Sequence, residues 1–249
     1  FRLSDFKSRA ILRGIEATTR IATGIPSDEV VAAARAEDTD LLIVGTRGSS
    51  GLAHVLLGST AERVIRTAPC PVLAVRTPDG DVSVEQGISL HRILAPTDFS
   101  KCSLEALEFA TLVAMQSKAS MELLHVLEPV SYGIDFTLGD SQEREQRRRR
   151  VTEGLNNLAA DLSKAGITVN TRTRGGVPAT TILEEAQISS SDLIVMGTHG
   201  RRGLSHLVAG SVTEAVLRLG QFAVLAVRTP KFGAGHRRII STTQSEHNV

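Results

Sequence analysis

Aromatic residues, long hydrophobic runs and net charge are all scarce in this chain of 249 residues. Phe, Trp and Tyr together make up 3% of the chain and Trp is absent, so aliphatic side chains must build the core. The apolar runs are far shorter than the roughly 20 residues that a membrane-spanning helix needs. The formal net charge is +1, so no global field recruits nucleic acid or a membrane surface.

Cysteine is scarce as well, which bears on redox state and metal binding. The two cysteines, Cys70 and Cys102, match no spacing typical of a metal or redox site. We interpret them as small apolar residues of a reduced intracellular protein, and we expect a cytoplasmic location. Because the first ten residues are polar, we expect no signal peptide.

A glycine pattern follows a hydrophobic run at residues 193–196, which we expect to form a buried strand. The residues of this pattern, spaced G-x2-G-x9-G-S, are Gly197, Gly200, Gly210 and Ser211. A glycine directly after a strand permits a sharp turn. We expect a helix to begin at Ser211, and the free amides and dipole of a helix N-terminus favour an anion such as phosphate. The pattern therefore indicates a loop suited to phosphate.

The same pattern occurs 152 residues earlier in the chain. Its residues are Gly45, Gly48, Gly58 and Ser59. Residues 14–78 align with residues 166–230 without a gap and share 27 identities over 65 positions. Composition alone gives roughly 6% identity between unrelated chains, so we interpret the two stretches as copies from an internal duplication.

Strands and helices are expected to alternate over residues 91–229, the complete second copy. The alternation β-α-β-α-β-α-β-α-β predicts a doubly wound α/β fold, with a parallel sheet and helices on both faces. In such sheets ligands bind beyond the carboxyl ends of the strands, where the strand order reverses. Asp98 and Gly197 both follow predicted strands, so they can face one pocket although they are far apart in the sequence.

The first copy, residues 1–78, holds only the later elements of this alternation. Its predicted elements are the tail of a helix over 1–13, a strand over 14–21, a helix over 26–36, a buried strand over 40–44, a helix over 59–67 and a strand over 71–76. Phe1 aligns with Glu153, so we interpret the chain as the C-terminal portion of a longer tandem protein or as a truncated gene product. Residues 79–90 are a predicted linker, and residues 230–249 a predicted disordered tail.

The glycine pattern, present twice, resembles that of the universal stress protein family, specifically its tandem members. The strands Ile93–Asp98 and Leu124–Val126 also resemble the first and second strands of that family. The resemblance implies a five-stranded parallel sheet of order 3-2-1-4-5, here duplicated with the first copy lacking its first strands. It also implies pairing through the fifth strand. Because residues 71–76 and 223–228 are those strands here, we expect the two copies to pair within one chain or to form a homodimer.

Carried over residue by residue, the resemblance implies that the second copy binds ATP or AMP, with or without Mg. Pro96, Thr97 and Asp98 would line the adenine and ribose end, Asp98 as a hydrogen-bond acceptor. Val126 and Met196 would contact the adenine. The ribose and phosphates would be surrounded by Gly197, Gly200, Gly210, Ser211 and Val212. The first copy has no strand that carries an aspartate, so it should not hold a complete nucleotide.

Several of these residues have a structural alternative. The S-x-x-E sequences that begin at Ser59 and Ser211 are capping boxes, and a serine N-cap stabilises a helix by roughly 1 kcal/mol without any ligand. Capping and phosphate contact can both hold for Ser211, because the same amides can meet a phosphate. Asp98 could likewise cap the helix expected to start near Ser100.

Other polar residues are better explained without a ligand. His54 and His206 occupy equivalent positions, but neither has a second ligand nearby, so surface or packing roles are favoured over a metal. Arg201–Arg202 could reach phosphates, yet the first copy has serines there, which favours solvated side chains. We interpret Arg147–Arg150 as a charged helix face, with an acidic partner as the lesser alternative.

The sequence favours an adenine-nucleotide sensor or regulator of the stress response over a metabolic enzyme. No Walker lysine follows the glycines, and no nucleophile–base pair is visible. One alternative is slow ATP hydrolysis or self-phosphorylation, with Ser211 or Thr198 as the acceptor. The other is a scaffold without nucleotide, whose functional surface is the strand pair 71–76 and 223–228. We expect no nucleic acid or membrane partner.

Overall fold

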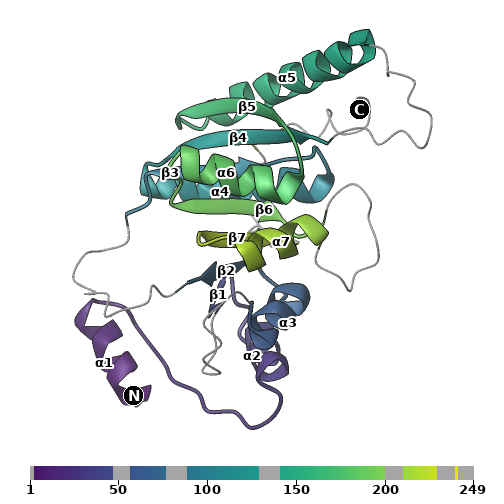
Figure 1. Ribbon diagram of the computed structural model, residues 1–249. Helices are drawn as coiled ribbons and strands as arrows, with labels where there is room; N and C mark the ends of the chain where they lie inside the picture. The colour runs from purple at the N-terminus through teal and green to yellow at the C-terminus, as the bar shows by residue number, and fades with distance from the viewer. Residues whose placement is uncertain are drawn as a thin grey trace, which may run out of the picture.

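One seven-stranded sheet forms the centre of the computed structural model, in the order β1-β2-β7-β6-β3-β4-β5 (Figure 1). The structure describes residues 3–46, 57–76, 89–128, 141–199, 210–228 and 239–240. The strands are β1 Leu42–Gly45, β2 Val72–Val75, β3 Arg92–Pro96, β4 Ser120–Leu127, β5 Val169–Gly175, β6 Leu193–Gly197 and β7 Ala223–Val227. The helices are α1 Leu3–Leu12, α2 Pro26–Ala36, α3 Ser59–Thr67, α4 Lys101–Ser117, α5 Ser141–Ser163, α6 Pro178–Ile188 and α7 Ser211–Leu219.

The second copy contributes the strands β3 to β7, and all of their mutual pairings are parallel. These strands lie in the spatial order β5-β4-β3-β6-β7, which is 3-2-1-4-5 when they are numbered within the copy. The order reverses between β3 and β6, so the carboxyl ends of these two strands flank the switch point of the sheet. Ligands of doubly wound folds bind at this place.

Helices cover both faces of the sheet, and each face has its own apolar core. Figure 1 shows α6 and α4 on opposite sides of the strands. The core under α2, α3, α6 and α7 includes Leu94 and Ile194, whereas the core under α4 and α5 includes Ile93 and Val195. Neighbouring residues of β3 and β6 thus point to opposite faces. Both faces are covered, which explains the continuous hydrophobic runs of these strands.

The two copies meet through β2 and β7, which form the antiparallel pair in this sheet. Leu73 lies opposite Leu225, and these residues are equivalent because they are 152 positions apart. The pairing is therefore symmetric about them, as in an isologous two-fold interface. Since β2 also pairs with β1 and β7 also pairs with β6, neither strand has an edge left for a homodimer while this intramolecular pairing stands.

Two arginines extend this symmetry beyond the strands. The Nη2 atom of Arg76 donates to the carbonyl oxygen of Arg218 at 3.0 Å. In the reciprocal contact, Nη1 of Arg228 donates to the carbonyl oxygen of Arg66 at 2.7 Å. Donors and acceptors are again 152 residues apart. Each arginine thus binds the last turn of a helix in the other copy. These helices are α7, which precedes β7, and α3, which precedes β2.

The strand predicted over residues 14–21 does not form, because residues 15–23 have no regular structure. Their equivalent in the second copy is β5, whose pairing partner is β4. Among the described residues, the first copy has no counterpart of β4. Backbone amides and carbonyls form a strand only against a neighbour that satisfies them, so the same pattern stays extended and exposed here.

The prediction of a buried strand over residues 40–44 was also wrong in one respect. A strand is present as β1, but Ile43 is 63% exposed, whereas its equivalent Val195 in β6 is 0% exposed. Helix α4 packs on β6 and covers Val195. The first copy has no counterpart of α4 among the described residues, so one face of β1 is bare.

The predicted helices are confirmed with small shifts at their ends. The helices expected over 1–13, 26–36 and 141–165 are α1, α2 and α5. Gly166, expected as a C-cap glycine, has a φ of +81°, the left-handed conformation that glycine adopts freely. Within the described ranges, none of the helices has the length and apolar character needed to cross a membrane.

Two described residues of the tail 230–249, for which disorder is predicted, contact α4. Glu108, which is 1% exposed, accepts hydrogen bonds from the amides of Ile239 at 3.0 Å and Ile240 at 2.7 Å. Ile240 is 6% exposed and joins the core under α4. The two amides thus satisfy a carboxylate that would otherwise be costly to bury.

Candidate functional site

The turn after β3 places a carboxylate at the carboxyl edge of the sheet. Pro96 and Thr97 are buried, whereas Asp98 is half-buried. Oδ1 of Asp98 accepts the amide hydrogen of Ser100 at 3.0 Å, and Ser100 is itself the N-cap of α4, accepting from the amide of Ser103. Asp98 is therefore not the helix cap. Its carboxylate fixes the turn that precedes the cap, and this turn follows β3, one of the two strands at the switch point.

Thr97 holds this turn from inside. Its Oγ1 accepts from the amide of Phe99 at 3.1 Å and lies 3.0 Å from Oγ of Ser103. Because Ser103 donates its own hydroxyl hydrogen to Ser100 O, the Thr97 hydroxyl is the donor in the pair. Nδ1 of His125 donates to the carbonyl oxygen of Thr97 at 2.8 Å. The Thr97 side chain thus supports Asp98 and is engaged within the protein.

Gly197, at the end of β6, lies against the first turn of α4. A Cβ atom at this position would lie 2.9 Å from the carbonyl carbon of Cys102 and 3.0 Å from its Sγ. Only glycine permits so close an approach, so internal packing explains Gly197 even without a ligand. The contact also brings the end of β6 against the helix that begins just after Asp98.

The N-terminus of α7 completes the edge, and here the predicted capping box was wrong. The N-cap is Gly210, with no side-chain cap hydrogen bond, and Ser211 is the first helical residue. Glycine occupies the capping position, so the serine comes one residue too late to cap. The same holds for Gly58 and Ser59 at α3. Gly210 has no side chain with which to cap the first-turn amides of α7, and amides at a helix N-terminus favour an anion. The Ser211 side chain is exposed.

The described ends of the glycine loop share one backbone hydrogen bond in both copies. The amide of Gly210 donates to the carbonyl oxygen of Thr198 at 2.6 Å, and the amide of Gly58 donates to that of Thr46 at 2.9 Å. A Cβ atom at Gly210 would lie 3.0 Å from Thr198 O. The first copy has no equivalent of Asp98, because residues 14–78 align only with 166–230. Only the loop of the second copy therefore follows a strand that lies beside β3, the strand that Asp98 follows.

Three further predicted site residues meet in one apolar cluster below this edge. Val126 at the end of β4, Met196 in β6 and Val212 in α7 all belong to the core under α6 and α7. Met196 is 5% exposed, so most of its surface packs against the protein, whereas Val126 and Val212 are half-buried. Among the described members of the predicted site, Ser211, assigned to the ribose and phosphates, is the exposed one.

Comparison with known proteins now decides the family. The model of the universal stress protein family matches residues 4–76 and again residues 89–228. The chain belongs to the universal stress protein family. The resemblance predicted from the glycine pattern and the first two strands is confirmed by these two matches.

Relatives of this universal stress protein include archaeal and mycobacterial members. It is 34% identical over 151 residues to Universal stress protein MJ0531 of Methanocaldococcus jannaschii, which covers 59% of this chain and 88% of that protein. It is 30% identical over 199 residues to Universal stress protein Rv2005c of Mycobacterium tuberculosis, covering 77% of this chain. The aligned part spans 62% of the length of the mycobacterial relative.

Solved structures share the fold of this universal stress protein. A universal stress protein from Archaeoglobus fulgidus superposes with a TM-score of 0.66 at 24% identity, covering 92% of this chain and 75% of that one. A universal stress protein crystallised in complex with cAMP is 25% identical over 57% of this chain, with a TM-score of 0.45. The likeness to the Archaeoglobus fulgidus protein shows the fold. The cAMP belongs to the other protein.

Some predicted residues of this universal stress protein lie outside the described ranges. These are Gly48, His54, Gly200, Arg201, Arg202 and His206. Among the residues that the structure does describe, no group of three His, Cys, Asp or Glu side chains could hold a metal ion. Thr198, one of the two proposed phosphate acceptors, is 1% exposed, which disfavours it relative to the exposed Ser211.

Both cysteines are free thiols, as the sequence indicated. Cys70 is 2% exposed and packs as a small apolar side chain. Sγ of Cys102 donates to the carbonyl oxygen of Val227 at 3.4 Å. Burial raises the pKa of the Cys102 thiol, so the group is protonated at neutral pH. It then acts as a hydrogen-bond donor to β7.

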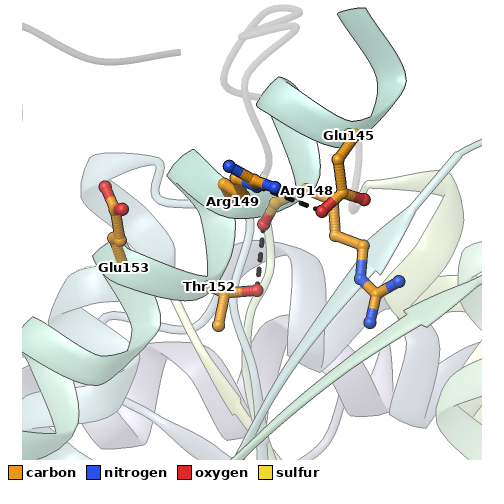
Figure 2. A pocket seen from close by; sticks show the side chains of 5 residues that line it. All are labelled: Glu145, Arg148, Arg149, Thr152 and Glu153. Atoms are coloured by element: carbon orange, nitrogen blue, oxygen red, sulfur yellow. Dashed lines mark hydrogen bonds and ion pairs between the residues drawn. The ribbon is translucent and has the colours of Figure 1, made fainter. Parts of the chain in front are cut away.

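The arginine run lies on α5, away from the candidate site. An open hollow of about 310 Å³ there is lined by Glu145, Arg148, Arg149, Thr152 and Glu153, whose side chains are drawn in Figure 2. Nε of Arg149 lies 3.1 Å from Oε1 of Glu145. The side chains of residues 148–150 are exposed, which agrees with the prediction of a charged helix face. This hollow contains none of the predicted nucleotide contacts.

A buried carboxylate that the sequence did not single out lies on α6. Glu185 is 0% exposed, with its carboxylate 2.9 Å from Nε of Arg172 and 3.5 Å from Nη1 of Arg174. Burial raises the pKa of Glu185; the two guanidinium groups oppose this shift, and the carboxylate of Glu122 reinforces it. The equivalent residue of the first copy is Ala33, so this ionic cluster is specific to the complete copy.

Proposed function

We propose that this universal stress protein binds one adenine nucleotide, ATP or AMP, in its second copy and acts as a sensor or regulator in the stress response. The observation that carries the proposal is the pairing of two features at one sheet edge. The N-cap of α7 is a glycine, which contributes no side-chain cap to the first-turn amides, and Asp98 follows the neighbouring strand β3. Amides of this kind favour phosphate, and a carboxylate accepts hydrogen bonds from ribose hydroxyls.

The two copies differ in what they offer to such a ligand. Gly58 and Ser59 repeat the uncapped helix start of the second copy, but without a carboxylate at a strand end. A complete nucleotide needs both ends recognised, so we expect one nucleotide for each chain. Mg²⁺ would enter with the phosphates, because this ion usually keeps water and phosphate oxygens as ligands.

Regulation by a nucleotide requires that it bind one conformation more tightly than another. Strand β7 pairs with β2 of the first copy on one side. On its other side it pairs with β6, where Val227 lies opposite Gly197. A nucleotide held at Gly197 and Asp98 would therefore favour one arrangement of this contact. The bound and free proteins would then present different surfaces to a downstream partner.

Isothermal titration with ATP, AMP and cAMP tests the proposal, with Asp98→Asn as the main variant. Asparagine keeps the oxygen that accepts from Ser100 and removes the charge, so the turn is retained. Loss of a hydrogen bond to a charged group should weaken nucleotide binding by about tenfold or more. Asp40→Asn, at an exposed aspartate of the first copy, is the matched control. No heat and no thermal shift at millimolar nucleotide would overturn the proposal.

A further inference from the structure

Phe99 has a backbone conformation that its side chain disfavours. Its φ is +63°, in the left-handed region that non-glycine residues rarely adopt and that aromatic residues adopt with strain. It directly follows Asp98 in the turn after β3. Strain of this kind persists only where surrounding contacts hold it in place.

The contacts that hold Phe99 come from β4 and α5. Its ring centroid lies 5.2 Å from that of His125, with the rings tilted by 39°. On the other element, a Cβ atom at Gly154 would lie 3.2 Å from Cε1 of Phe99. The ring thus packs closely against the helix backbone at a position where any larger residue would push it.

Asp98 lies between two residues that are fixed by these contacts. On one side, the carbonyl of Thr97 accepts from Nδ1 of His125 at 2.8 Å. On the other side, the amide of Phe99 donates to Oγ1 of Thr97 at 3.1 Å. The backbone on both sides of Asp98 is therefore held, by β4 through His125 and by α5 through the packing of Gly154 against the Phe99 ring.

Gly154 is also unfavourable at its own position in the chain. It lies in the interior of α5, a helix of 23 residues, where glycine is less favourable than alanine. A glycine would suit the left-handed turn, and a larger residue would suit the helix, yet the chain has Phe99 in the turn and Gly154 in the helix. Two locally unfavourable residues in one contact indicate that the position of the ring matters.

We infer that Phe99, His125 and Gly154 are positioning residues that aim the Asp98 carboxylate, so that the placement of α5 sets the nucleotide affinity of the site. This inference rests on the proposed nucleotide binding at Asp98. The three residues do not contact the ligand. A shift of α5 moves the ring, the ring moves the turn, and the turn moves the carboxylate.

Gly154→Ala separates positioning from stability. Alanine raises the helix propensity of α5 while its methyl group displaces the Phe99 ring by a few tenths of an ångström. The melting temperature should stay the same or rise, while the Kd for ATP weakens by about fivefold, because small misplacements of a binding group are costly. An unchanged Kd with an unchanged or raised melting temperature would contradict the inference.

Two substitutions of Phe99 distinguish the effect of its aromatic ring from the effect of its backbone strain. Phe99→Ala removes the ring and keeps the strained backbone, whereas Phe99→Gly removes both. Both variants should lose affinity for ATP, and Phe99→Gly should be the more stable of the two. If Phe99→Gly bound ATP as tightly as the unaltered protein, the ring would have no positioning role. Phe109→Ala, at a partly buried phenylalanine of α4 that packs on the same core, is the control and should bind normally.

His125 offers a rescue by a conservative variant. In His125→Asn the side-chain amide nitrogen takes the place of Nδ1 and can still donate to Thr97 O, whereas His125→Leu has no donor. Both variants lose the ring contact with Phe99, so ATP binding should be weaker in the second than in the first, and equal binding by both would contradict the inference. If the unaltered protein bound no ATP, both the proposed function and the inference would fail. If it bound ATP and none of these variants changed the Kd, only the inference would fail.

Discussion

Leu155 and Leu3 occupy equivalent positions in the two copies, yet Leu155 is 0% exposed on α5 and Leu3 is 45% exposed on α1. One turn later, Leu158 is 2% exposed and Phe6 is 55% exposed. Both helices have an apolar stripe, but only α5 packs on β4 and β5. No residue of α1 is buried, and Figure 1 shows α1 at the lower left, apart from the sheet. The difference lies in the neighbours and not in the sequence pattern.

Positions that have the same neighbours in both copies behave alike. Val64 on α3 and Val216 on α7 are both 0% exposed. Ile25 and Val177, which precede α2 and α6, are 57% and 64% exposed. An amphipathic pattern therefore specifies which face of an element is apolar, whereas the packed neighbour decides whether that face is buried.

The comparison extends from packing to the candidate site. Both copies have the glycine pattern in their sequence, and in both a glycine is the N-cap of the helix that follows. Only the second copy has β3, and with it Asp98 beside β6. The glycine pattern is therefore a feature of each copy's own sequence, whereas the proposed site needs a strand that only the complete copy contributes.

The largest effect should come from placing a charge on the face that α4 covers. Val195→Asp puts a carboxylate without a partner into the core, and we expect a loss of about 4 kcal/mol or more, or failure to fold. Ile43→Asp, at the equivalent exposed residue, should change the free energy of unfolding by no more than about 0.5 kcal/mol. Urea unfolding of both variants measures the difference. Similar losses would show that Ile43 is buried by a neighbour after all.

A smaller but clear effect is expected from truncating the helix stripe. Leu155→Ala leaves a cavity under α5 and should cost about 2–5 kcal/mol. Leu3→Ala removes a side chain that is already 45% exposed and should cost less than about 0.5 kcal/mol. The midpoints of urea unfolding compare the two. A cost above 2 kcal/mol for Leu3→Ala would break the contrast between the copies.

Much of the fold could be predicted from the sequence, because it depends on local periodicity and glycine placement. Helix α5 and the C-cap at Gly166 depend on residues close in the chain. The strand over 14–21 was wrongly predicted, because a strand also needs a pairing partner. The capping box predicted at Ser211 was wrong by one residue, because Gly210 occupies the N-cap position of α7.

The part of the site that could not be predicted depends on contacts between distant residues. Asp98 and Gly197 were predicted from their positions at strand ends. The Phe99 ring, in contrast, meets Gly154 and His125 from other elements. Nothing local in the sequence shows that a phenylalanine adopts a left-handed conformation or that a helix glycine makes room for it.

The buried cluster at Glu185 predicts a pH dependence that the first copy lacks. Burial raises the pKa of Glu185 above its ordinary value of 4.5, so the folded state binds this proton more tightly than the unfolded state does. Its contribution to stability is therefore largest below pH 4.5 and falls as the pH rises through the raised pKa.

Glu185→Gln should abolish this fall. Urea unfolding from below pH 4.5 to neutral pH checks it: stability relative to the unaltered protein should increase with pH and then level off. Ala33→Gln, at the equivalent position of the first copy, should show no such trend. A difference between Glu185→Gln and the unaltered protein that stayed constant with pH would contradict the raised pKa.

The smallest effect is expected at the two serines that begin α3 and α7. Ser59→Ala and Ser211→Ala should each change the free energy of unfolding by less than about 0.5 kcal/mol, because neither serine caps its helix. Ser100→Ala should cost about 1 kcal/mol, since Ser100 is the N-cap of α4. Thermal unfolding of the three variants distinguishes them. Equal losses at all three positions would restore the capping interpretation of Ser211.

A crystal structure of the protein grown with saturating ATP would test whether the complete copy holds the nucleotide. We expect one nucleotide in each chain, with its phosphates at the first-turn amides of α7 and its ribose at Asp98. No nucleotide should lie beside Gly45 in the first copy. A nucleotide at Gly45, or an empty edge at Asp98 and Gly197 under these conditions, would contradict this expectation.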